Sequence, residues 1–223
     1  KCRISSEETL KTIYRTNLFE TALKKCLGIF IIPIKTNGWS NQTSSEKRYL
    51  DLVDDCIKKD GLMGMVQSKK NSNDVYKVGC LGRISDSQKN VDGRMIINLT
   101  GLTRFEIKEE LETGKLYREF KVDYQSFEED TSVEKIIEQN KIDILFQKAK
   151  DFFKRNGIIL NWREFEKIEN TQKINTLSMI APISNEEKQK LLETVTLNDK
   201  IMVLTKIIEF YFYSSATDEK IIQ

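Results

Sequence analysis

VYKVGCLGRIS, residues 75–85, is the stretch of this sequence that decides its fold class. Apolar and polar side chains alternate along it, which is the period of a half-buried β-strand. Four more segments show the same alternation: LMGMVQ at 62–67, RMIINLT at 94–100, LTRFEIKEEL at 102–111 and LYREFKVDY at 116–124. The connections are short and contain Asn, Asp or Gly, and a single Gly101 separates two of the segments. Five strands joined by short turns predict antiparallel pairing in a small sheet or barrel.

The period of the apolar residues becomes helical after the acidic residues 128–130. Five helices are predicted, over 142–153, 161–168, 174–181, 184–193 and 198–213. Asn161 and Ser184 are each followed three residues later by Glu, which indicates N-cap residues. In the last helix, the residues predicted to face the core are Ile201, Leu204, Ile207, Ile208, Tyr211 and Phe212. The β-rich part should therefore end near residue 125 and helices should fill 135–213, which makes an α+β fold.

The first 61 residues contain segments with the helical period of apolar residues and a segment typical of a strand. SSEE at 5–8 fits a capping box, and apolar residues at 10, 13 and 14 then predict a helix. A second helix is predicted over 18–27 and a β-branched strand over 29–34. Another helix is predicted to begin at Ser45 and to end at Gly61.

The composition excludes several classes of function. The 223 residues carry 36 Lys and Arg against 34 Asp and Glu, and this net charge of +2 gives no electrostatic case for nucleic acid or an anionic membrane. Histidine is absent, which removes Ser-His-Asp and Cys-His catalysis and His-ligated zinc. No apolar run approaches the ~20 residues of a membrane span. The four cysteines form no CxxC pair, so we expect reduced thiols in the cytoplasm.

Local motifs identify no catalytic, cofactor-binding or metal-binding residue, and we expect no cofactor. No Walker A loop is present, and adjacent acidic pairs such as Glu109-Glu110 point apart and read as solvated surface. Gly79 and Gly82 lie inside a strand pattern, which favours a bulge or tight bend. Asp92-Gly93-Arg94 predicts a hairpin turn with Gly93 at positive φ, and contact of Asp92 and Arg94 with a ligand is a second interpretation.

Taken in order, the motifs of residues 46–213 resemble the N-terminal substrate-binding domain of Lon proteases, above all the free-standing bacterial proteins made of that domain alone. The resemblance is carried by EKRYL (46–50), GMV (64–66), YKVGCLGRI (76–84), DGR (92–94), LTGLTRF (99–105), YR (117–118), LSMIAP (177–182) and EEKQKLLE (186–193). We assign structural roles to the family-motif residues, which are Glu46, Arg48, Tyr49, Gly64, Gly79, Gly82, Arg83, Asp92, Gly93, Arg94, Gly101, Arg104 and Phe105.

The resemblance implies a PUA-like β pseudo-barrel over residues 46–125, followed by an all-helical bundle over 126–223. It also implies binding of unfolded or extended polypeptides. The ATPase and Ser-Lys protease domains of Lon would lie further C-terminal, and this sequence ends at Gln223. We therefore expect a non-catalytic module in protein quality control, working with a separate protease.

Residues 1–45 depart from the family pattern. Only IIPI at 31–34 is similar to the family's first strand, and NQTSS at 41–45 stands where an apolar segment is expected. Local divergence and a misread coding frame both explain such an abrupt loss of similarity. In either case we expect an incompletely covered sheet edge, because a barrel strand would be missing.

Two functions from different classes remain at this stage. The first is capture of a polypeptide along an open sheet edge or in an apolar groove, which demands little of the client's sequence. The alternative is binding of RNA or a nucleotide, because PUA-like barrels also serve that purpose. The near-neutral charge and the lack of a basic stripe interleaved with aromatic residues favour the polypeptide, and we expect no nucleic-acid partner and no membrane. Nothing in the sequence sets the oligomeric state.

Overall fold

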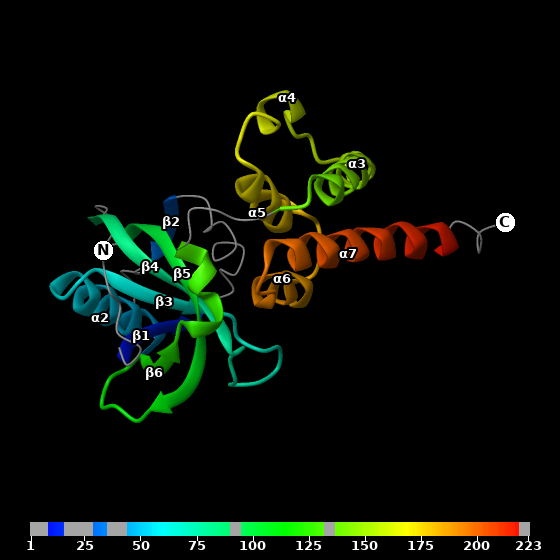
Figure 1. Cartoon of the computed structure of the whole chain (residues 1–223). Helices are drawn as coiled ribbons and strands as arrows, with labels where there is room; N and C mark the ends of the chain where they lie inside the picture. Colours follow the sequence, from blue (N-terminus) through cyan, green and yellow to red (C-terminus); the bar gives the residue numbers. More distant parts are fainter. Residues whose placement is uncertain (1–8, 16–28, 35–43, 90–94, 132–136, 219–223) are drawn as a thin grey trace. The chain divides into compact units, whose positions relative to one another are not determined.

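The computed structural model describes residues 9–15, 29–34, 44–89, 95–131 and 137–218 (Figure 1). The chain divides into two compact units, residues 1–131 and 132–223, here called the barrel unit and the helical unit. All described strands lie in the barrel unit, and no described strand follows residue 123. The predicted α+β fold, a β pseudo-barrel followed by a helical bundle, is confirmed.

The barrel unit contains six strands, one α-helix and one 3-10 helix among its described residues. Their bounds are β1 Thr9–Arg15, β2 Ile29–Ile34, α2 Ser44–Lys58, β3 Leu62–Val66, β4 Val78–Lys89, β5 Met95–Leu111, β6 Arg118–Asp123 and η2 Gln125–Thr131. The helix predicted from Ser45 is α2, and the strand predicted over 29–34 is β2. The helix predicted over 18–27 lies outside the described residues.

The sheet closes on itself around one ring of strands. Its order is β2-β5-β4-β3-β1-β6, and β5 also pairs with β6, which joins the two ends of the ring β5-β4-β3-β1-β6. The β1–β3 pair is parallel, and every other pair is antiparallel. β5 can pair with three strands, β2, β4 and β6, because it is 17 residues long. Its first half pairs with β2 and its second half with β6.

The first strand corrects one expectation about the N-terminus. Residues 9–15 form a strand and not a helix, with Ile13 beside Gly64 of β3 and Leu10 beside Phe120 of β6. The spacing of Leu10, Ile13 and Tyr14 fits a helix. However, the segment also contains two Thr, one Ile and one Tyr, which favour a strand when two neighbours offer backbone partners. β1 joins β3 to β6 and so completes the ring of strands. In the described sheet β2 pairs on one side only, with β5.

Gly101 lies inside a strand and does not form the turn that the sequence predicted. Leu81 pairs with Thr103 while Gly82 pairs with Gly101, so Leu102 is an extra residue in β5. Such a bulge bends a strand and increases its twist. The two facing glycines allow this bend, because a Cβ on Gly82 would lie 2.5 Å from the Leu99 side chain.

Two apolar clusters fill the barrel unit. One joins Leu52, Val53 and Cys56 of α2 to the sheet residues Ile97 and Leu99. The other cluster consists of Val66, Leu81, Phe105, Phe120 and Val122. The apolar face of α2 therefore covers one part of the sheet, and the barrel interior holds the rest of the core.

The described helices of the helical unit follow the predicted order. Their bounds are α3 Gln139–Arg155, α4 Trp162–Phe165, α5 Asn170–Ile180, α6 Asn185–Glu193 and α7 Leu197–Asp218. Asn161 accepts a hydrogen bond from the Glu164 amide, and Ser184 and Glu187 form a complete capping box, as predicted. A single cluster centred on the buried Leu145, Phe153, Leu177, Leu191 and Leu204 forms the core of this unit.

Candidate functional site

The described family-motif glycines lie in the barrel wall. A Cβ on Gly79 would lie 2.5 Å from the Met65 carbonyl oxygen and 2.6 Å from the Phe105 ring. Phe105 itself is fully buried, and Gly64 pairs with Leu81 in the middle of the sheet. The contacts of Gly64, Gly79 and Phe105 are thus with the barrel interior and its strands.

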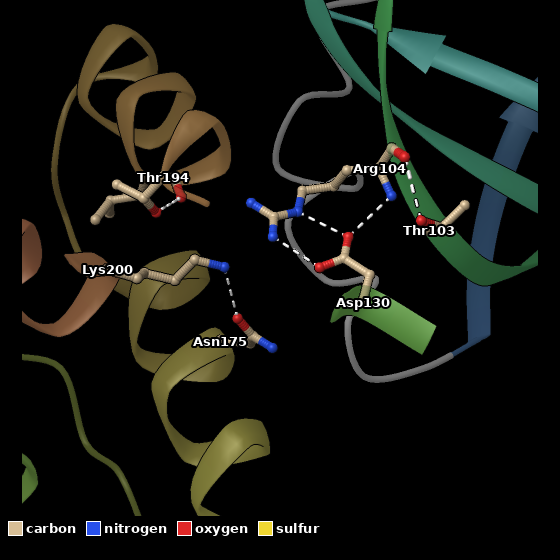
Figure 2. Close-up of polar contacts among 7 residues, drawn as sticks. Thr103, Arg104, Asp130, Asn175, Thr194 and Lys200 are labelled. Atoms are coloured by element: carbon tan, nitrogen blue, oxygen red, sulfur yellow. Dashed lines mark hydrogen bonds and ion pairs between the residues drawn. The ribbon is translucent and has the colours of Figure 1, made fainter. Parts of the chain in front are cut away.

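Arg104 holds η2 against β5 through a buried ion pair. Its Nε donates to Asp130 Oδ2 at 2.8 Å and its NH2 group donates to Asp130 Oδ1 at 2.7 Å, as Figure 2 shows. The Arg104 amide also donates to Asp130, and the Phe127 ring lies 4.3 Å from the guanidinium carbon. The side chains of Arg104 and Asp130 are only 5% and 10% exposed.

The remaining motif residues are dispersed. Arg48 donates to the Tyr49 hydroxyl and stacks over its ring on α2, and exposed Arg83 donates to the Asp60 carbonyl. The side chain of Glu46 and the whole of Asp92-Gly93-Arg94 lie outside the described residues, so neither interpretation of that turn is tested. The structure therefore places Gly64, Gly79, Gly82, Arg83, Gly101, Arg104 and Phe105 on the strands of the barrel wall, and Arg48 and Tyr49 on α2.

One polar cluster in the barrel unit has shifted pKa values. Lys115 Nζ donates to Asp55 Oδ2 at 2.6 Å, and the Tyr117 hydroxyl bonds to both groups. The bond from Lys115 holds the pKa of Asp55 below its ordinary value, and the same bond raises the pKa of Lys115. Burial raises the pKa of Tyr117 to about 12. All three pKa values move away from neutrality, whereas general acid–base catalysis needs a pKa near the working pH. This cluster ties α2 to the connection between β5 and β6.

A second polar contact lies inside the helical unit. Lys200 of α7 is buried and donates to Asn175 Oδ1 of α5 at 3.0 Å, and Thr194 caps the end of α6 by donating to the Leu191 carbonyl (Figure 2). Asn175 Nδ2 is buried and makes no hydrogen bond within the described residues. The Lys200–Asn175 bond joins α7 to α5, whereas the Thr194 bond is local to the end of α6.

Helix α7 carries three of the nine exposed large apolar side chains of the described residues, more than any other element. Its inward face matches the prediction: Ile201, Leu204, Ile207 and Ile208 are buried, and Tyr211 and Phe212 pack against the cluster. The opposite face carries Met202, Phe210 and Tyr213, which are 41%, 64% and 76% exposed. The helical period that predicts the inward residues also places these three on the outside, so the sequence itself carries the signal for them.

The neighbouring helix α3 fixes the border of this face. Lys148 of α3 forms an ion pair with Glu209 of α7, and the Phe152 ring lies 5.8 Å from the Tyr211 ring. Exposed Lys206 lies between Met202 and Phe210, one helical turn from each. We call Met202, Lys206, Phe210 and Tyr213 the α7 row.

Two other kinds of feature, a metal site and a membrane-spanning helix, are absent from the described part of the chain. No group of three or more Cys, Asp or Glu side chains there is arranged to hold a metal ion. No described helix is both long enough and apolar enough to cross a membrane.

Comparisons with known proteins point to one family. The family model described as the ATP-dependent protease La (LON) substrate-binding domain matches residues 43–209. The structure of a Lon N-terminal domain protein from Xanthomonas campestris matches with a TM-score of 0.57 at 16% identity, covering 88% of this chain and 96% of that one. The N-terminal domain of the Mycobacterium avium complex Lon protease matches with a TM-score of 0.55 at 12% identity, covering 91% and 98%. A search of curated proteins gives no significant match.

Proposed function

The chain belongs to the LON substrate-binding domain family, and on this premise we propose that it binds extended or unfolded polypeptides through the α7 row. The observation that carries the proposal is the exposure of Phe210 and Tyr213 on one helix face beside Met202. Aromatic residues and Met are enriched where proteins meet their partners. An aromatic ring offers a large contact area at a low cost in side-chain entropy, because it has only two χ angles.

The size of the row favours a short segment over a folded partner. A buried aromatic side chain removes about 150–250 Å² from water. Two partly exposed rings and one Met side chain therefore offer a few hundred Å², against about 800 Å² per partner in a stable interface between folded proteins. An unfolded chain presents apolar side chains in short stretches, which suit a contact of this size.

The same proposal covers the cellular role and the compartment of the chain. We place it in protein quality control, as a receptor that passes clients to a separate protease and has no catalytic activity of its own. We place it in the cytoplasm, because its four cysteines form no CxxC pair and the two described ones, Cys56 and Cys80, are buried. Neither ATP hydrolysis nor peptide cleavage should be detected in purified protein freed of contaminating protease.

The test is a binding titration with a fluorescent, permanently unfolded polypeptide. Phe210→Ala and Tyr213→Ala should each weaken binding about five- to thirtyfold, which corresponds to 1–2 kcal/mol for an interface anchor. The matched control is Ile159→Ala, since Ile159 is 98% exposed in the same unit but lies outside the α7 row. Unchanged affinity in both row variants would refute the proposal. Binding of an RNA homopolymer that weakens steeply with salt would instead favour the nucleic-acid alternative.

A further inference from the structure

The α7 row has a regular spacing. Met202, Lys206 and Phe210 are four residues apart, and an α-helix rises 1.5 Å per residue, so successive side chains are about 6 Å apart along the helix axis. Tyr213 extends the row by one further turn beside Phe210. The row thus presents an apolar group, a cation and an aromatic pair in that order.

An extended polypeptide has nearly the same repeat. A strand rises about 3.3 Å per residue, and alternate side chains point to the same face, so same-face side chains are about 6.6 Å apart. Residues one, three and five of a client laid along α7 would therefore stand opposite Met202, Lys206 and Phe210. The mismatch is about 0.6 Å per step, which flexible Met and Lys side chains can absorb.

The charge at the centre of the row decides what the middle client residue should be. Lys206 is exposed, and the nearest acid along the helix face, Glu209, is bound to Lys148 of α3. Lys206, Glu209 and Lys148 together carry one net positive charge. A client carboxylate opposite Lys206 would lie between two apolar contacts, and a client cation there would be repelled.

We propose that the α7 row selects extended segments in which an acidic residue lies between two apolar residues, in the order apolar, any, acidic, any, apolar. The inference rests on the proposed function and specifies its client class. The order is the same when read from either end, so a client can bind in both chain directions. Such a segment is common in unfolded chains. The α7 row would therefore bind clients that contain it more tightly than clients that lack it, without requiring a unique sequence.

The experiment compares four peptides of equal length by NMR titration of the isotope-labelled chain. Their cores are Leu-Ser-Asp-Ser-Leu, Leu-Ser-Ser-Ser-Leu, Leu-Ser-Lys-Ser-Leu and the shifted Leu-Asp-Ser-Ser-Leu. The central Asp should improve affinity about two- to fivefold over Ser at low salt, the range of an exposed ion pair. The central Lys and the shifted Asp should give no gain. The advantage of Asp should shrink in 0.5 M salt, where screening shortens the reach of charge to a few ångströms.

The charge-reversed variant gives the decisive comparison. Lys206→Glu should invert the preference, so that the central Lys peptide binds more tightly than the central Asp peptide. Equal affinities for Asp and Ser cores, or a preference that Lys206→Glu does not invert, would overturn the inference.

The Phe210→Ala variant separates this inference from the proposed function. If the inference fails but Phe210→Ala still weakens binding of all four peptides, the proposed function stands. If Phe210→Ala changes none of them, the proposed function fails as well. A peptide-independent dimer, or binding to anionic vesicles that exceeds binding to every peptide, would also overturn the inference.

Discussion

At the scale of single residues, ion pairs in the barrel unit differ greatly in their surroundings. Arg104 and Asp130 are almost completely buried, while Lys108 and Glu106 form a pair on the surface. Removing one member of a buried pair leaves an uncompensated charge in a poorly solvated place. An exposed pair is screened by water and contributes little.

Asp130→Ala should lower the free energy of unfolding of the chain by about 3–5 kcal/mol. The surface variant Glu106→Ala is the matched control and should cost less than about 1 kcal/mol. Urea unfolding followed by tryptophan fluorescence and by circular dichroism measures both. Equal losses in the two variants would show that the Arg104–Asp130 pair does not fix η2 to the barrel.

Asp55 should make part of the stability depend on pH. Its pKa is lower in the folded chain than in the unfolded chain, because Lys115 donates to the carboxylate. The unfolded chain therefore binds more protons near the ordinary pKa of about 4. The stabilisation is fully present above that pH and is lost as the pH falls through the folded pKa.

Asp55→Asn should consequently flatten the fall in stability between pH 5 and pH 3. Urea midpoints measured at half-unit steps of pH check this. Asp54→Asn is the control, since Asp54 is the exposed neighbour on α2. A variant that loses stability with the same slope as the parent chain would contradict the role of Asp55.

At the scale of elements, the barrel depends on close approach of strands β3, β4 and β5. Gly79→Ala would place a Cβ 2.5 Å from a backbone oxygen, which can move only if the strand moves. Overpacking of this kind costs about 1–3 kcal/mol. Gly114→Ala is the control, because a Cβ there would meet nothing within 4 Å. Differential scanning calorimetry should show a lower Tm for Gly79→Ala alone, and equal Tm values would mean that the strands are farther apart than described.

Most elements could be predicted because their signals are local. The cap residues Asn161 and Ser184, the inward face of α7 and the alternation in β4 each depend on residues within one element. The errors arose where partners distant in sequence decide the outcome. Residues 9–15 are a strand because β3 and β6 lie on either side, and the chain continues through Gly101 as a bulged strand because Gly82 pairs with it.

The candidate site was harder to predict than the fold. The motif residues of the resemblance identified the family, but those that the structure describes lie in the barrel wall or make local contacts. The α7 row carries no motif, since exposed Phe210 and buried Ile208 differ only in their angle around the helix. The kind of ligand is thus predicted by the resemblance to the family. The surface that binds it, the α7 row, is identified only by the exposure of its side chains in the structure.

At the scale of the whole molecule, β1 links the N-terminal segment to the barrel. Its residues pair with β3 on one side and β6 on the other. Backbone amides paired on both sides of a strand exchange slowly with solvent. Hydrogen exchange should therefore protect amides of 9–15 to a similar degree as those of β3. Fast exchange across 9–15, with protection beginning in α2, would show that the ring is open at that position.

The central claim is that unfolded polypeptides contact the α7 row. A photo-cross-linking side chain placed at Met202, 41% exposed in the helical unit, tests this most directly against one at Leu116, 51% exposed in the barrel unit. We expect an unfolded client to cross-link to position 202 at a yield well above that at 116, and an excess of unlabelled client to abolish the product. Equal yields at the two positions, or cross-linking confined to position 116, would contradict the claim.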